Sequence, residues 1–215
     1  MKTLDMKIWP RAESFNYFND YEYPLFNVCA QIQITKTVQY LENHGISKHN
    51  AILWMISCAA NSVTEIRYRI RKKIVVEHDR VDPSFAVLVK DHSLAFCAVE
   101  YSEDVPVFFT RVDQGIATIK ANPKLHDKPG VDNLLYISCI PWISFTAISH
   151  PVKKGPTDCI PRISWGKFIQ NKEMVFMPVS LQLHHGLADG YHAGLFFNKL
   201  EELLDQPEAI DWPIG

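Results

Sequence analysis

The chain has 215 residues, of which 47% are apolar and 21% are charged, and its formal net charge is −2. This is the balance of an ordinary globular protein, and the interspersed charges exclude the basic footprint of a nucleic-acid partner. No apolar run reaches the roughly 18 residues of a membrane span, and the N-terminal MKTLDMKIWPRAESF lacks the apolar core of a signal peptide. With no linker or repeat, residues 1–215 are predicted to form a single cytoplasmic domain.

Hydrophobic periodicity predicts the elements in chain order. In the first half, helices are expected at 11–20, 35–45 and 48–63, and strands at 24–35, 73–78, 84–91 and 93–101. In the second half, helices are expected at 105–121 and 190–204, and strands at 134–140, 142–149, 162–169 and 173–185. Strands outnumber helices and come in runs, which indicates an α+β fold with a mixed or mostly antiparallel sheet rather than a βαβ repeat.

Two features of the elements need a physical interpretation. Pro178 lies inside the longest predicted strand, which implies a sheet edge, a bulge or an interrupted ladder, because proline has no N–H to donate. The cysteines are odd in number, widely spaced and without a C-x-x-C pair, so they are predicted to be free thiols rather than a disulfide framework or a zinc site. They are Cys29, Cys58, Cys97, Cys139 and Cys159.

The stretch LQLHHGLADG places two histidines at the end of an apolar run. In an extended chain His185 shares a face with Leu183, whereas His184 shares one with Gln182. Burial on the apolar face disfavours the imidazolium, and a neutral imidazole has the acceptor nitrogen that a general base requires. Gly186 lets the chain turn, and Asp189 is suited to cap the helix that follows.

Two other interpretations of these histidines stay open. If residues 185–192 were helical, His185, Asp189 and His192 would share one face with the spacing of metal ligands. The preceding apolar β-run and the flanking glycines argue against that helix, and a glycine-flanked turn holds ligands poorly. The pair is also open to a purely structural role, with each ring held by a hydrogen bond.

The motif H-x-x-x-D-G, here His185 to Gly190, resembles the catalytic motif of CoA-dependent acyltransferases. Several other stretches of the chain resemble the type A (trimeric) chloramphenicol acetyltransferases and occur in the same order and at the same spacing. The similar stretches are 9–18, 65–70, 81–88, 141–149 and 166–203. The resemblance covers essentially the whole chain. It implies a two-layer sandwich whose sheet is covered by helices, acetyl-CoA as co-substrate without a metal, a small alcohol as acceptor, and a homotrimer with active sites at subunit interfaces.

The same resemblance implies roles for four residues of the catalytic centre. His185 is expected to remove the proton of the acceptor alcohol, and Ser144 to donate a hydrogen bond to the tetrahedral oxyanion. Asp189 is expected to pair with Arg11 in a buried ion pair that fixes the loop carrying His185. The alternative is that Asp189 only caps its helix while Arg11 is solvated.

Six further residues match binding positions of the family. Tyr17, Phe18 and Phe96 match aromatic positions of the acceptor pocket, and Ser164 stands where the family has a threonine that holds a water molecule there. Lys48 and Lys167 match lysines implicated in binding the phosphates of coenzyme A. Without the resemblance, these aromatics would be interpreted as core and the lysines as solvated side chains.

The acceptor is the least determined part of the prediction. The resemblance implies transfer to the 3-hydroxyl of chloramphenicol. The segment HPVKKGPTDCIP, residues 150–161, departs from the family's asparagine- and phenylalanine-rich segment, which helps to wall the drug pocket. A different, endogenous alcohol therefore stays open as the acceptor, as does a member of the family that binds a ligand without turnover.

Overall fold

The computed structural model describes residues 1–125, 130–152 and 158–213. In these ranges the α-helices are α1 (Ala12–Asn19), α2 (Thr35–Asn43), α3 (Lys48–Ser62), α4 (Val105–Ala121) and α5 (Gly190–Asp205). The strands are β1 (Lys2–Thr3), β2 (Leu25–Gln33), β3 (Tyr68–Arg71), β4 (Ile74–Glu77), β5 (Asp82–Leu88), β6 (Leu94–Ala98), β7 (Leu134–Ile140), β8 (Arg162–Gly166), β9 (Ile169–Asn171) and β10 (Met174–His184). Short 3-10 turns are η1 (Thr64–Arg67), η2 (Lys90–His92) and η3 (Pro207–Ala209).

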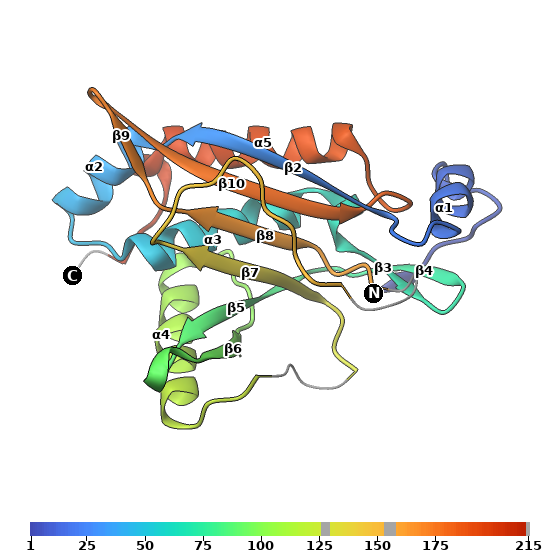
Figure 1. The fold of residues 1–215 in the computed structure, drawn as a ribbon, viewed down its shortest axis with the longest axis horizontal. Helices are drawn as coiled ribbons and strands as arrows, with labels where there is room; N and C mark the ends of the chain where they lie inside the picture. Colours follow the sequence, from blue (N-terminus) through green and yellow to red (C-terminus); the bar gives the residue numbers. More distant parts are fainter. Residues whose placement is uncertain (126–129, 153–157, 214–215) are drawn as a thin grey trace.

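A mixed sheet forms one layer of the fold (Figure 1), in the order β2-β10-β8-β7-β5-β6, with β9 pairing onto β10. The contacts of β7 with β8 and with β5 are parallel, and the others in this sheet are antiparallel. A smaller sheet, β1-β4-β3, lies near the N-terminus. The architecture confirms the predicted α+β sandwich.

Helices α3 and α5 cover one face of the large sheet, and α4 lies beside β5 and β6 (Figure 1). Helix α3 is apolar on nearly every side and is buried: Leu53, Met55 and Ile56 have no exposed surface. Ser47 caps this helix by accepting a hydrogen bond from the backbone N–H of Asn50 at 3.3 Å. Burying one such aliphatic side chain stabilises the fold by about 1.5–3 kcal/mol, so α3 is the centre of the core.

The other face of the sheet is polar. The side chains of Asn27 and Gln31 on β2 point to this face, because they alternate with buried Ile32 and its neighbours on the core side. Their amides donate to the backbone carbonyls of Ile148 (2.9 Å) and Phe145 (3.1 Å). The segment 141–152 therefore crosses this face, which is visible in Figure 1 as the orange trace in front of the strands.

The prediction of a strand at 142–149 was wrong. Strand β7 ends at Ile140, and none of residues 142–149 pairs with a neighbouring strand. One backbone bond, from Lys167 N–H to the carbonyl of Ile143 at 2.8 Å, ties the segment to the chain after β8. Trp142 and Ile143 of this apolar run are exposed, so the run does not form the buried face of a strand, and the side-chain amides of Asn27 and Gln31 bind the segment in place of a partner strand.

Pro178 lies in an interrupted ladder, one of the three arrangements expected for it. Strand β10 pairs with β2 from Phe176 to His184 and has partners on its other side as well, so it is not an edge strand. On its other side, β8 pairs with Val179 to Gln182 and β9 pairs with Met174 to Phe176. Pro178 falls between these two ladders, where its missing N–H leaves no bond unmade.

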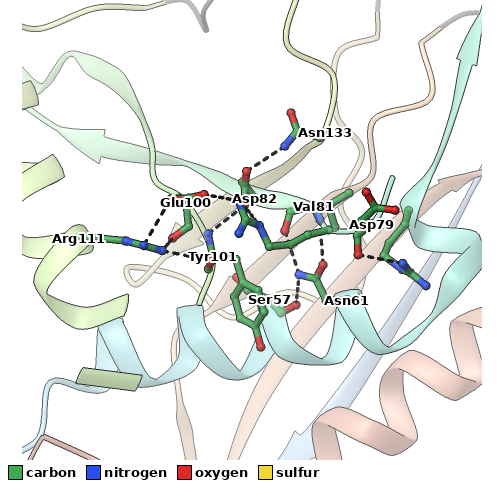
Figure 2. A network of polar contacts seen from close by, with 11 residues as sticks. Ser57, Asn61, Asp79, Val81, Asp82, Glu100, Tyr101, Arg111 and Asn133 are labelled. Carbon is green, nitrogen blue, oxygen red and sulfur yellow. Dashed lines mark hydrogen bonds and ion pairs between the residues drawn. The ribbon is translucent and has the colours of Figure 1, made fainter. Parts of the chain in front are cut away.

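A polar network fixes the beginning of β5 against α3, β6 and α4 (Figure 2). Asn61 of α3 donates to the carbonyls of Ser57 and Val81 and accepts from the N–H of Val81, each at 2.9 Å. Asp82 accepts from the N–H of Tyr101 and from the amide of Asn133, both at 2.9 Å. The network satisfies backbone groups where the chain enters the sheet.

None of the described helices is long and apolar enough to span a bilayer.

We expect Asn61→Ala to lower the free energy of unfolding by about 1–3 kcal/mol, because it leaves the N–H and C=O of fully buried Val81 without partners. Urea denaturation followed by circular dichroism measures this. Ser62→Ala, at the exposed neighbouring position, is the control and should change the free energy by less than about 0.5 kcal/mol. Equal losses for both variants would show that the Asn61 bonds contribute nothing specific.

Candidate active site

The two adjacent histidines have different environments at the end of β10. His184 is the last strand residue, is buried, and its Nδ1 accepts from the N–H of Gly186 at 3.2 Å. His185 lies in the following turn and is half-buried, with its N–H bonded to the carbonyl of Pro24 at 2.7 Å. The expectation that His185 would be the buried histidine was therefore wrong, since the strand ends one residue before it. His184 shapes the turn, and His185 is available for chemistry.

Aromatic rings hold the imidazole of His185. The ring of Phe18, on α1, stacks on it with centroids 3.9 Å apart and planes 8° apart. Phe26, which pairs with Leu183 on the apolar face of the sheet, lies 4.7 Å away at a tilt. The Nδ1 atom of His185 is buried and has no hydrogen-bond partner within the described ranges. The ring thus turns one nitrogen inward and packs on the apolar side that the alternation predicted.

Asp189 combines the two roles that the sequence had left as alternatives. Its Oδ1 accepts from the N–H of Tyr191 at 3.0 Å, which caps α5. Its Oδ2 lies 2.6 Å from Nη1 of Arg11, in an ion pair whose side chains are 15% (Arg11) and 35% (Asp189) exposed. The pair forms as the resemblance implied, although it is partly rather than fully buried. Nη2 of Arg11 also reaches the carbonyl oxygen of His185 at 3.4 Å, so the pair braces the turn that carries His185.

The charge of Asp189 is strongly favoured in the folded state. Burial by itself would raise the pKa of this carboxyl, but the hydrogen bond from Arg11, the charge of His192 and the N–H of Tyr191 outweigh it and lower the pKa to about 2. The carboxylate is therefore ionised throughout the physiological range.

His192, at the third position of α5, also contacts Asp189, with its Nδ1 2.8 Å from Oδ1. The metal interpretation had grouped it with His185 and Asp189 as ligands. Residues 185–189 form a turn rather than a helix, and no group of three or more potential metal ligands occurs among the described residues. The pairing of His192 with Asp189 was not predicted, although a polar residue three positions after an Asp cap is the sequence signature of a capping box.

The aromatic residues expected in the acceptor pocket lie in two places that are far apart in the fold. Tyr17 and Phe18 of α1 lie beside His185 and, with Tyr21, form a ring cluster with centroid distances of 5.1 to 5.5 Å. Tyr17 is 62% exposed. Phe96 lies on β6, at the opposite edge of the sheet from β2. Because strands are spaced by about 4.8 Å, Phe96 of one chain does not reach the same chain's His185.

The segment that departs from the family places polar groups beside Ser164. The fully buried hydroxyl of Ser164 lies 3.2 Å from Nε2 of His150. Burial and the charge of Arg162 both lower the pKa of His150, so this ring is neutral near pH 7. Arg162 in turn forms a buried ion pair with Asp158 at 2.7 Å. Residues 153–157 of the segment lie outside the described residues.

The two lysines assigned to coenzyme A meet in one hollow. Lys48, at the start of α3, and Lys167, just after β8, line a cavity of about 290 Å³ together with Cys139 and Trp165. The ammonium of Lys48 is paired with Glu42. Two cations at an apolar hollow suit a ligand with an anionic end and an apolar arm.

Ser144 lines an adjoining hollow of about 480 Å³ that also includes Lys167. Contacts at Gly166 show where Ser144 lies along the sheet. A Cβ added to Gly166 would lie 2.8 Å from the carbonyl oxygen of Ile143, the residue before Ser144, and 2.8 Å from the ring of Pro178. Ser144 therefore lies near the level of Pro178 on β10. Pro178 is seven residues before His185. At about 3.3 Å per strand residue, Ser144 and His185 of one chain lie roughly 20 Å apart, so the chain does not bring these two together.

Comparisons with known proteins match one family over nearly the whole chain. The family model for chloramphenicol acetyltransferase matches residues 1–201. A chloramphenicol acetyltransferase of Staphylococcus aureus is 28% identical over 215 residues, covering 97% of both chains, and chloramphenicol acetyltransferase 3 of Escherichia coli is 28% identical over 203 residues, covering 93% of this chain and 95% of that one.

Solved structures show the same fold. A chloramphenicol acetyltransferase, 27% identical, superposes with a TM-score of 0.83 over 94% of this chain and 99% of that one. A dihydrolipoamide acetyltransferase of Azotobacter vinelandii has a TM-score of 0.66 at 16% identity, over 93% of this chain and 88% of that one, which is a likeness of fold alone. The fold and these matches define a CoA-dependent acyltransferase. The chain belongs to the chloramphenicol acetyltransferase family.

We expect the charge of Asp189 to stabilise the fold in a pH-dependent way. Because its pKa is lowered to about 2 from an ordinary value near 4, its contribution is complete above about pH 4 and is lost as pH falls toward 2. Asp189→Asn keeps a capping side chain but removes the charge. The gap in free energy of unfolding between the two proteins, measured with urea from pH 7 to pH 3, should narrow below pH 4. A constant gap would contradict a role for the charge.

Proposed function

We propose that this enzyme transfers the acetyl group of acetyl-CoA to a hydroxyl of a small alcohol, with the 3-hydroxyl of chloramphenicol as the first candidate acceptor. The observation that carries the proposal is the braced turn: a half-buried His185 ring clamped by Phe18 and held through the Arg11–Asp189 ion pair. The chain is proposed to act as one cytoplasmic domain. The names of its relatives, at 24–28% identity, support the drug as acceptor.

In the proposed reaction, His185 acts as general base. With the inward Nδ1 carrying a proton, the lone pair of Nε2 accepts the proton of the acceptor hydroxyl as its oxygen attacks the thioester carbonyl. The tetrahedral intermediate carries an oxyanion, which the hydroxyl of Ser144 stabilises by donating a hydrogen bond. Collapse breaks the carbon–sulfur bond, and the imidazolium returns its proton to the departing thiolate, which gives an acetyl ester and free CoA.

The site is proposed to form between copies of the chain. Within one chain, Ser144 and the lysine-lined hollow lie near Gly166, far along β10 from His185. A head-to-tail contact brings the turn of one copy to the hollow of the next, and such contacts close into rings. A homotrimer with three identical sites satisfies this requirement. The exposed rings of Tyr17 and Tyr21 beside His185 are available to such a contact.

A second acceptor class is favoured by one observation. Beside Ser164 the chain places His150 and the buried Arg162–Asp158 pair, a strongly polar environment. Polar groups suit a hydroxyl-rich acceptor, whereas a nitrophenyl ring favours apolar and aromatic walls. An endogenous polar alcohol is therefore the alternative acceptor, and a ligand-binding member without turnover is the alternative outside catalysis.

We expect the wild-type protein to release CoA thiol from acetyl-CoA when chloramphenicol is added, in an assay with a thiol reagent. His185→Ala should lower kcat at least about 100-fold, because the alcohol loses its base. No release with chloramphenicol but release with a polyhydroxylated alcohol in a parallel panel would move the acceptor to the second class. Tight binding of acetyl-CoA without release of CoA thiol for any alcohol would favour the alternative of a ligand-binding protein without turnover.

Ser144 is tested in the same assay. Ser144→Ala should lower kcat about 100- to 1,000-fold, as for removal of an oxyanion donor. Thr146→Val and Ser149→Ala remove the other hydroxyls of the same segment and are the matched controls. If one of the controls loses activity while Ser144→Ala keeps it, the donor is another hydroxyl of this segment and the role of His185 is unaffected.

Mixing two inactive variants tests the shared site. His185→Ala and Ser144→Ala chains, co-expressed with different tags and purified through both, should regain up to about a third of wild-type activity. Purification through both tags leaves mixed trimers, and each of these has one head-to-tail interface in three that pairs an intact histidine with an intact serine. If Ser144→Ala is itself active, Lys167→Glu serves as the partner of His185→Ala in this experiment, because it exchanges a positive charge of the hollow for a negative one. Sites contained within one chain would give no recovery.

A further inference from the structure

His192 links two carboxylates that come from different parts of the fold. Its side chain is 11% exposed. Nδ1 lies 2.8 Å from Oδ1 of Asp189, and Nε2 lies 3.6 Å from Oε1 of Glu65 in η1. Carboxylates accept and do not donate, so the short contact to Asp189 requires that Nδ1 carries the proton. The ring therefore acts as a donor that orients the carboxylate of Asp189.

The contacts continue from Asp189 to the catalytic turn. The second oxygen of Asp189 is bound to Arg11, and Arg11 reaches the carbonyl oxygen of His185. Glu65, His192, Asp189, Arg11 and the backbone of His185 thus form one connected chain of polar contacts. It joins η1, the start of α5, α1 and the end of β10, elements that are far apart in the sequence.

We propose that His192 is a positioning residue for acetyl transfer: by fixing the carboxylate of Asp189 it keeps Arg11 on the turn and so sets where His185 presents its ring. This rests on the proposed function of His185. His192 is separated from the substrate by Asp189 and Arg11, so it acts only through them. A displacement of a reacting group by about 1 Å can cost 100-fold in rate, which is the reason that such a support matters.

A role in helix capping alone explains less of the geometry. The N–H of Tyr191 already bonds to Asp189, so the helix has a cap without His192. The alternative bond of a capping box, from the N–H of Asp189 to Nδ1 of His192, is longer, at 3.2 Å, than the contact with the carboxylate. Glu65 on the far side of the ring has no part in a cap. The ring's position between two carboxylates is accounted for by its orienting role.

Two amide substitutions separate the two sides of the ring. In His192→Asn the amide nitrogen replaces Nδ1 and still donates toward Asp189. In His192→Gln it extends toward the Nε2 position and Glu65. With acetyl-CoA and chloramphenicol, or the alcohol that the panel selects, His192→Asn should keep kcat within about 3-fold. His192→Gln and His192→Ala should lose about 10- to 100-fold in kcat, with the KM for acetyl-CoA changed by less than about 3-fold.

A second readout does not depend on turnover. Amide hydrogen exchange, measured by mass spectrometry on peptides that contain residues 185–189, should become faster in His192→Gln and His192→Ala but not in His192→Asn. His44→Ala, at an exposed histidine after α2, is the control and should change neither readout. If wild-type protein releases no CoA with any alcohol, the proposed function fails while the exchange data still decide whether His192 holds the turn.

Two results would overturn the inference. One is equal behaviour of His192→Asn and His192→Gln in both kcat and exchange, which would show that donation toward Asp189 is not what matters. The other is a loss of thermal stability in His192→Ala with kcat and the exchange of residues 185–189 unchanged, which would reduce His192 to a helix-capping residue.

Discussion

The hydrogen bonding of β10 on both of its edges is the constraint on which the rest of the molecule depends. Of its eleven residues, Phe176 to His184 pair with β2, and the other edge pairs with β9 over Met174 to Phe176 and with β8 over Val179 to Gln182. This makes β10 a rigid element roughly 36 Å long. One end leads to the cation-lined hollow and the other to the His185 turn. Because the strand cannot shorten, the two halves of the proposed site stay apart in one chain, and the proposed reaction requires a second copy.

The sequence predicted most elements because their apolar residues repeat with the period of the structure they form. The helix at 105–121 and the strand at 134–140 have the expected bounds. The strand expected at 142–149 failed because its apolar run is not a buried strand face: Trp142 and Ile143 are exposed. An apolar run does not determine what its backbone bonds to, and here the carbonyls of Ile148 and Phe145 accept from the amides of Asn27 and Gln31.

The candidate site was predictable where its residues are close in sequence. His185, Gly186 and Asp189 could be assigned from the motif, whereas Arg11, 178 positions from Asp189, came only from the resemblance. The contacts of His192 with Glu65 and of His150 with Ser164 join separate elements, and no local pattern encodes them. The distinction between buried His184 and half-buried His185 depended on where one strand ends, which periodicity fixes only to within a residue or two.

The parallel stacking of Phe18 on His185 has a consequence for which molecules can react. One π-face of the imidazole is blocked at van der Waals distance, and Phe26 flanks the ring at a tilt. In the proposed reaction the acceptor hydroxyl meets the lone pair of Nε2 in the plane of the imidazole. Because Phe18 covers one face of that plane, the rest of the acceptor has to lie on the side of the ring away from Phe18.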